Sequence, residues 1–174
     1  MDYIAELTAI AKAHGGIIET NKAAQHGISK AMLSKLCKEG KIHRIVKGQY
    51  ILSDDMQDEL LAISNRSRNL IFSHETALYL HGISDRTPFE HTVTAPSNCI
   101  PSSSIKNECK VYFIKPELFE LGKTLLKTLA GNEVPGYDLE RTICDIIRSR
   151  NKIGTETFLA ALKMYAACPK KDLN

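Results

Sequence analysis

Apolar side chains recur every three or four residues near the start of the chain. This spacing predicts a helix over about residues 2–14, capped by Asp2 and ended by Gly15. Residues 17–19 are mainly apolar and favour a short strand, after which Thr20 is expected to cap the next helix. The apolar positions of the first helix are Ile4, Leu7, Ile10 and Ala11.

Two shorter helical segments follow, separated by a glycine. We predict helices over about residues 21–26 and 30–39, with Gly27 in the turn between them. Ser29 is placed to cap the second of these helices, and Gly40 is placed to end it. The inward stripe of that helix consists of Leu33, Leu36 and Cys37.

A β-hairpin is predicted directly after these helices. Residues 42–46 and 49–52 are rich in β-branched and aromatic side chains, and only Lys47 and Gly48 separate them. The order of helix, turn, helix and hairpin is typical of a winged helix-turn-helix domain, here assigned to residues 1–55. The common use of such a unit is to place a helix in the major groove of DNA.

The remaining residues, 56–174, mix helical and alternating patterns. They predict a C-terminal α+β domain with a small sheet, so the whole chain is expected to be α+β. We expect helices over about residues 60–70, 73–82, 139–149 and 155–167, and a short helix or a turn over 116–121. We expect strands over about residues 91–95, 110–114 and 125–129, and a loop over 96–104.

Composition is that of an ordinary globular protein. The 174 residues are 43% hydrophobic and 25% charged, and no apolar run approaches the ~20 residues that span a bilayer. The start of the sequence lacks a signal-peptide pattern, so we expect a cytoplasmic protein without membrane association. The five cysteines are widely spread, which argues against a disulfide framework and a structural zinc site.

The distribution of charge changes this picture. The net charge is only +3, but the 26 residues from Lys22 to Lys47 contain seven basic residues and a single acidic one, Glu39. A basic stretch on an otherwise near-neutral protein is expected where a protein contacts phosphate. A solvated lysine-rich surface would give the same pattern.

The candidate DNA contacts lie in and beside the predicted helix-turn-helix. Ser29 and Lys30 begin the helix that approaches base edges, whereas Lys35, Lys38 and Lys47 are better placed for phosphates. Ser29 has an alternative role as a helix cap, and Arg44 could instead hold the hairpin in place. The full candidate set is Lys22, Ser29, Lys30, Ser34, Lys35, Lys38, Arg44, Lys47 and Gln49.

Two patterns suggest metal chemistry, and neither is complete. His74-Glu75 resembles the start of a zinc-protease motif, but position 78 is Leu, and His81 lies too far along the helix. Glu108 and Lys110 resemble part of a magnesium-dependent nuclease core without its further acidic residue. No phosphate-binding loop or nucleophile elbow is present. We therefore expect no catalytic residue, no metal and no cofactor, and keep the nuclease as an alternative.

Three segments together resemble the AbiEi family, the antitoxins of bacterial type IV toxin–antitoxin and abortive-infection systems. The first comprises Gly-Ile-Ser-Lys-Ala-Met-Leu-Ser-Lys-Leu (27–36) and Arg-Ile-Val-Lys-Gly-Gln-Tyr (44–50). The second runs from Phe72 to Pro88 and includes Ser-His-Glu-Thr-Ala-Leu-Tyr-Leu-His-Gly (73–82), followed by Thr-Val-Thr (92–94). The third is Asp-Leu-Glu-Arg-Thr-Ile-Cys-Asp-Ile-Ile-Arg (138–148).

The resemblance implies a transcriptional autorepressor that binds inverted repeats in its own promoter. It also implies an antitoxin whose partner is a nucleotidyltransferase-like toxin, countered without a stable complex between the two proteins. Family members usually continue with a further amphipathic helix past the position that matches residues 172–174. An alternative reading is a winged-helix module that docks a protein and does not bind DNA.

Overall fold

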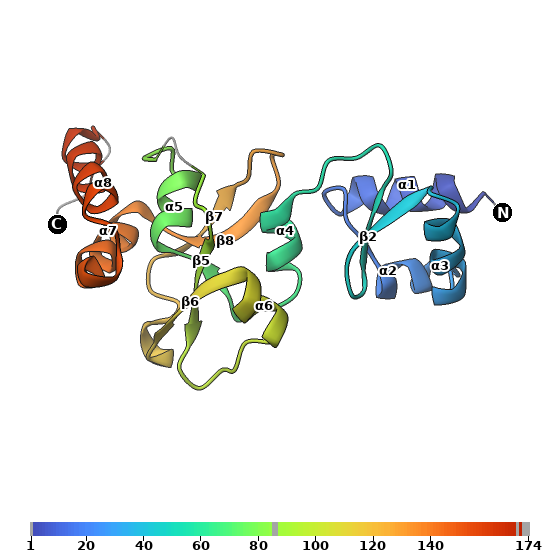
Figure 1. The fold of residues 1–174 in the computed structure, drawn as a ribbon, viewed down its shortest axis with the longest axis horizontal. Coiled ribbons are helices and arrows are strands. Elements are labelled where there is room, and N and C mark those ends of the chain that lie inside the picture. Colours follow the sequence, from blue (N-terminus) through green and yellow to red (C-terminus); the bar gives the residue numbers. More distant parts are fainter. Residues whose placement is uncertain (1, 85–86, 170, 172–174) are drawn as a thin grey trace. The chain divides into compact units, whose positions relative to one another are not determined.

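This computed structural model describes residues 2–84, 87–169 and 171 (Figure 1). Their strands form two separate sheets, one of three strands and one of five. The mixture of helices and small sheets confirms the α+β class. The chain divides into two compact units, residues 1–63 (unit 1) and 64–174 (unit 2). The division therefore follows residue 63, whereas the sequence placed the boundary after residue 55.

Unit 1 begins with three helices. Helix α1 spans Tyr3–Ala13, α2 spans Thr20–Gln25 and α3 spans Lys30–Lys38. Asp2 caps α1 by accepting hydrogen bonds from the backbone N–H groups of the first turn. Thr20 does not cap α2, because Glu19 occupies that position and Thr20 is the first helical residue. All three predicted helices of this unit are present within a residue or two.

The three-stranded antiparallel sheet of unit 1 combines one strand from between α1 and α2 with two strands that follow α3. Strand β1 is Ile18–Glu19, β2 is Ile42–Val46 and β3 is Gln49–Leu52, and their order in the sheet is β1-β3-β2. The β2–β3 hairpin has the predicted two-residue turn at Lys47-Gly48, where Gly48 adopts a positive φ of 89°. The register shifts between Arg44 and Val46, so β2 carries a bulge close to the turn.

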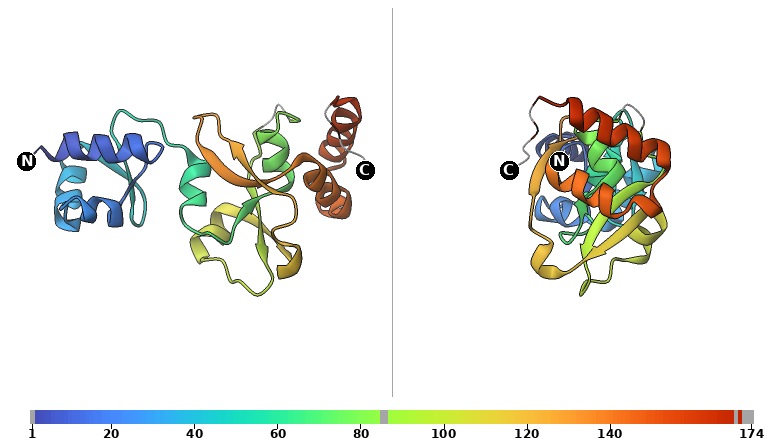
Figure 2. Two further views of the ribbon diagram at one scale, coloured as in Figure 1. Left: turned by 180° about the vertical axis from the view of Figure 1, so that it is seen from behind. Right: turned by 90° about the vertical axis from the view of Figure 1, so that its left-hand side faces the viewer.

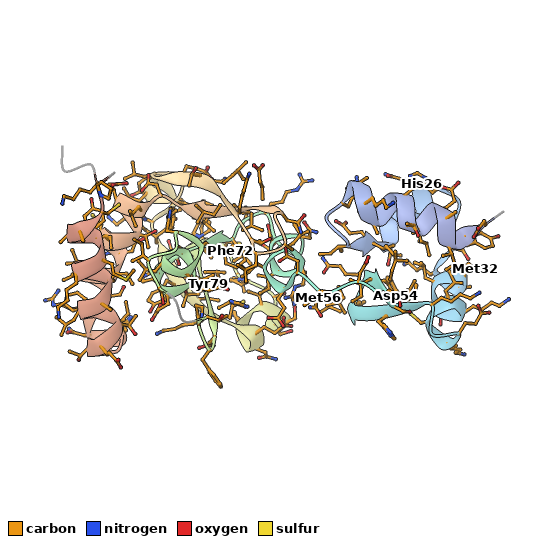
Figure 3. The ribbon with its side chains drawn as sticks, turned by 90° about the horizontal axis from the view of Figure 1, so that it is seen from above. His26, Met32, Asp54, Met56, Phe72 and Tyr79 are labelled. Atoms are coloured by element: carbon orange, nitrogen blue, oxygen red, sulfur yellow. The ribbon has the colours of Figure 1, made fainter. Side chains whose placement is uncertain are left out.

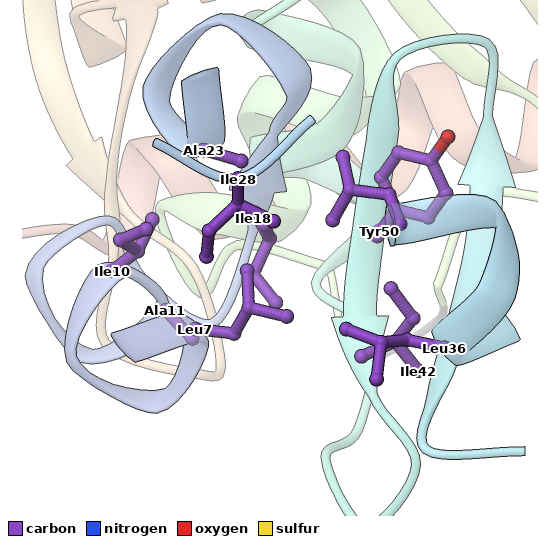
Figure 4. Close-up of a cluster of buried hydrophobic side chains, with 10 residues drawn as sticks. Leu7, Ile10, Ala11, Ile18, Ala23, Ile28, Leu36, Ile42 and Tyr50 are labelled. Carbon is purple, nitrogen blue, oxygen red and sulfur yellow. The ribbon is translucent and has the colours of Figure 1, made fainter. Parts of the chain in front are cut away.

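An apolar cluster forms a shared core in unit 1 (Figure 4). Leu7 of α1, Leu33 of α3 and Ile42 of β2 are fully buried in it, so the helices and the hairpin share one core. Burial of each such side chain contributes about 1.5–3 kcal/mol. The other buried members are Ile10, Ala11, Ile18, Ala23, Ile28, Leu36 and Tyr50.

Within unit 1, residues 53–58 form no helix or strand. Asp54 and Met56 lie in this segment (Figure 3), and Met56 is almost fully exposed. Helix α4, Glu59–Ser64, begins after Asp58, whose carboxylate accepts a hydrogen bond from the Leu61 N–H at 3.1 Å. The helix is shorter than predicted, since it ends at residue 64 and not at residue 70.

The sheet of unit 2 has the strand order β6-β5-β4-β8-β7. The pairs β5–β6 and β4–β8 are parallel, whereas β4–β5 and β7–β8 are antiparallel. Strand β4 lies at the centre, and neither β4 nor β8 was predicted from the sequence. The strands are β4 Ile71–Phe72, β5 His91–Pro96, β6 Cys109–Ile114, β7 Lys123–Lys127 and β8 Glu133–Tyr137.

Helices of unit 2 pack against this sheet and against one another. Helix α5 contacts both β5 and α7, and α8 packs against α7 (Figure 2). Within the described residues, no helix is long and apolar enough to cross a membrane. The helices are α5 His74–Leu80, α6 Ser103–Glu108, α7 Leu139–Arg148 and α8 Thr155–Ala167, with 3₁₀ turns at Pro116–Leu118 and Arg150–Lys152.

Candidate nucleic-acid interface

The residues in and just before α3 determine its placement, with one face buried and the other exposed to solvent. Gly27 makes the preceding turn with a φ of +75°, a conformation that costs little only for glycine. The Ser29 hydroxyl accepts a hydrogen bond from the Met32 N–H at 3.2 Å and so caps the helix. Leu33 and Leu36 are buried in the core of unit 1, which turns the opposite, polar face outwards.

The outward face of α3 carries an incompletely neutralised positive charge. Lys30, Lys35 and Lys38 are all exposed, as is Ser34 between them. Glu39 lies 3.9 Å from the ammonium group of Lys35, and it also pairs at 3.1 Å with Lys41. Lys30 and Lys38 have no ion pair among the described residues, so their charges remain available to a polyanion.

The hairpin turn presents a further lysine from a fixed backbone. Lys47 is exposed at the tip. The carbonyl oxygen of the next residue, Gly48, accepts hydrogen bonds from the Thr20 N–H at 2.9 Å and the Thr20 hydroxyl at 3.2 Å. On the other side of Lys47, the Nε of Arg44 donates to the Val46 carbonyl at 3.3 Å. The backbone is thus held on both sides of Lys47.

The structure separates the predicted contact residues into different groups. Ser29 is engaged as a cap, and the Arg44 side chain holds the hairpin, which are the alternative roles considered for both residues. Lys22 is half-buried in α2. Gln49 is a correction: it is only 5% exposed, on the strand β3 that lies between β1 and β2, so it is no surface contact in this conformation. Besides Ser29 and Arg44, the exposed candidates are Lys30, Ser34, Lys35, Lys38 and Lys47.

Three residues near this surface were absent from the sequence-based set. Lys41 and His43 are exposed at the start of β2, and the basic run of the sequence already pointed to Lys41. Thr20 is the third, since it fixes the hairpin turn from a position 28 residues earlier in the chain. No local pattern indicates a contact of that separation.

Glu108, which belongs to the nuclease-like pattern in unit 2, is engaged in an ion pair. Both carboxylate oxygens of Glu108 accept hydrogen bonds from the guanidinium of Arg66, at 2.8 and 2.6 Å. The hydrogen bonds from Arg66 lower the pKa of Glu108, although partial burial opposes the shift. The geometry therefore gives Glu108 a structural partner and does not favour a magnesium site built on it.

The histidines of the zinc-like pattern are also engaged. The His74 ring lies between the hydroxyls of Ser73 and Ser149, each 3.0 Å from one ring nitrogen, and it stacks on Tyr112 with ring centroids 3.6 Å apart. The His81 Nε2 is 2.8 Å from the Tyr137 carbonyl oxygen. In the part of the chain that the structure describes, no group of three or more His, Cys, Asp or Glu side chains could hold a metal ion.

Comparison with known proteins gives a likeness of fold. No protein-family model matches the chain, and no curated protein matches it. Among solved structures it is similar to the RV2827C protein from Mycobacterium tuberculosis, with a TM-score of 0.67 and 15% sequence identity. The alignment covers 97% of this chain and 68% of that protein. At this identity the match shows a common fold across nearly the whole chain.

Proposed function

We propose that unit 1 is a winged helix that binds double-stranded DNA, and that the chain is a transcriptional autorepressor. One observation carries the proposal: the exposed face of α3, with Lys30 and Lys38 unpaired among the described residues, lies in the same small unit as a rigid hairpin bearing Lys47. The order of helices and strands and the β1-β3-β2 sheet are those expected of a winged helix. Helix α3 then corresponds to the recognition helix.

The residues divide into two kinds of contact in this proposal. Lys30 and Ser34, on the exposed face of α3, reach base edges in the major groove and supply sequence discrimination. Lys35, Lys38 and Lys47 contact phosphates, which orient the protein without reading sequence. Pairing with Glu39 makes Lys35 the weaker of these contacts.

The resemblance to AbiEi antitoxins extends the proposal to the whole chain. The DNA target is then an inverted repeat in the chain's own promoter, and the protein acts in the cytoplasm. Its functional partner is a nucleotidyltransferase-like toxin encoded beside it, countered without a stable complex. Growth of cells that express this toxin should be restored by co-expression of the chain, and failure to restore growth would remove the antitoxin part alone.

The DNA-binding part is tested by mobility-shift titration of the full chain on its upstream DNA. We expect nanomolar-range binding that weakens steeply with salt, by about 0.9 in log–log slope for each phosphate contact. Lys30→Ala should reduce the preference for the upstream sequence over random DNA. Lys47→Ala should weaken binding about equally on both DNAs and lower the salt slope by about one.

Lys12→Ala is the matched control, because Lys12 is an exposed lysine in the last turn of α1. It should leave affinity and salt slope unchanged. If Lys30→Ala and Lys47→Ala both behave like Lys12→Ala, the assignment of this surface to DNA is wrong. Salt-insensitive binding of a protein through the same face would instead support the docking-module alternative.

A further inference from the structure

A cavity of about 620 Å³ lies within unit 2, between α5, the start of β5, β6 and α8. This volume is in the range that accommodates small organic molecules. Leu78, Ala161 and Met164 form much of its apolar wall. Phe89, which also lines the cavity, is fully exposed to solvent.

One wall of the cavity carries an acceptor without a donor. The Oε2 atom of Glu75, in the first turn of α5, is buried and has no hydrogen-bond partner among the residues that the structure describes. Lys110 lines the same cavity, but its ammonium group donates to the Lys152 carbonyl oxygen at 3.0 Å. A buried carboxylate oxygen without a donor is costly, so a ligand group that donates a hydrogen bond to it would be favoured at this wall.

The charge of the cavity favours a cationic donor. Glu90 lines it together with Glu75, so that two carboxylates and the ammonium group of Lys110 lie at the cavity among the described residues, and Glu156 also lines it. A neutral donor would supply a hydrogen bond to Glu75 but would not change the charge of the cavity. A protonated amine or amidine would also offset the excess negative charge, and charge-assisted hydrogen bonds are roughly twice as strong as neutral ones.

We propose that this cavity is a binding site for a small molecule that carries a protonated amine or amidine on an apolar body. The cationic group donates to Glu75, and the apolar body packs against Leu78, Ala161 and Met164. The inference concerns unit 2 alone and does not depend on DNA binding by unit 1.

The test titrates benzamidine into the ¹⁵N-labelled full chain and follows backbone amide shifts by NMR. We expect saturable shifts at residues around the cavity, including Glu75 and Ala161, with a dissociation constant of about 1 mM for a probe of this size. Benzyl alcohol, which has a similar body without the cation, should bind at least about tenfold more weakly. Benzoate, with the opposite charge, should give no saturable shifts at these residues.

Two variants test separately the hydrogen-bond acceptor Glu75 and the volume of the cavity. Glu75→Gln keeps the shape and should weaken benzamidine binding at least about tenfold, whereas Glu133→Gln, at an exposed position on β8, should not. Ala160→Trp, at an exposed position on α8 that lines the cavity, should block binding of every probe by filling it. The unliganded spectra show whether each variant folds. Equal binding of benzamidine and benzyl alcohol, unchanged affinity in Glu75→Gln, or shifts confined to other regions would each overturn the proposal.

Discussion

The surroundings of His74 hold its backbone in an uncommon conformation and its side chain in the neutral form. It is 3% exposed, and its φ of +48° lies in the left-handed region, which is uncommon outside glycine. Its ring is fixed by Tyr112 and by the hydroxyls of Ser73 and Ser149. Burial lowers the pKa of His74 to about 3, and the nearby charges of Lys110 and the arginines of α7 act in the same direction.

This shift predicts a loss of stability in acid. The ordinary histidine pKa is 6.5, so between pH 6.5 and about 3 the unfolded chain binds a proton that the folded chain does not. The contribution of His74 is therefore fully present above pH 6.5 and is lost as the pH falls. Its slope approaches about 1.4 kcal/mol per pH unit. Urea unfolding of the full chain between pH 7 and pH 4.5 measures it.

The variant His74→Asn separates this slope from the titration of other groups. Asparagine tolerates a positive φ and keeps a polar side chain, but it does not titrate. We expect the variant to be less stable at pH 7 and to lose less stability than the wild type on acidification. His14→Asn, at an exposed position after α1, should keep the wild-type dependence. Parallel curves for wild type and His74→Asn would contradict the prediction.

Among the elements, the hairpin and α2 form a coupled pair. The two hydrogen bonds from Thr20 to the Gly48 carbonyl join the first residue of α2 to the turn of the hairpin. The side-chain bond is the one that a substitution can remove. Without it, the turn would keep its glycine conformation but lose a link to the helical part of unit 1.

Thr20→Val removes the hydroxyl and keeps the shape of the side chain. We expect a loss of about 0.5–1.5 kcal/mol in unfolding free energy, as for a typical hydrogen bond. Since the turn carries Lys47, the change should also weaken DNA binding on all sequences, a result that rests on the proposed function. Urea unfolding and mobility-shift titration measure the two effects.

Thr8→Val is the matched control, because the Thr8 hydroxyl also donates to a backbone carbonyl, that of Ile4 at 2.8 Å, but within α1. It should cost similar stability and leave DNA affinity unchanged. In the Thr20→Val background, Lys47→Ala should have a smaller effect on affinity than in the wild type. Strict additivity of the two changes would show that Thr20 does not position Lys47.

The helices and the hairpin of unit 1 could be predicted from the sequence. Helical spacing and glycine placement were sufficient for α1, α2, α3 and the hairpin, because each is specified by neighbouring residues. The two-residue strand β4, the strand β8 and the helix α6 were missed. Strand β4 is too short for a periodic pattern, and its place at the centre of the sheet depends on partners distant in sequence. The burial of Gln49 was missed for the same reason, since it depends on the place of β3 between β1 and β2, and β1 is distant in the sequence.

At the scale of the whole molecule, the chain contains separate apolar cores. Leu33 belongs to the cluster of unit 1, and Ile146 belongs to a cluster of α5, α7 and α8 in unit 2. Both side chains are fully buried. If each unit is stabilised chiefly by its own core, a large-to-small change in one unit should leave the other folded.

Paired core variants test this independence. Leu33→Ala and Ile146→Ala should each lower the stability of their own unit by about 2–5 kcal/mol. Native-state hydrogen exchange of the full chain should show faster exchange confined to residues 1–63 in the first variant and to residues 64–174 in the second. DNA binding should be weakened in Leu33→Ala and retained in Ile146→Ala, because the proposed contacts all lie in unit 1. Loss of protection across both units in either variant would mean that the chain unfolds as one cooperative body, and the division of DNA binding and ligand binding between the units would then need revision.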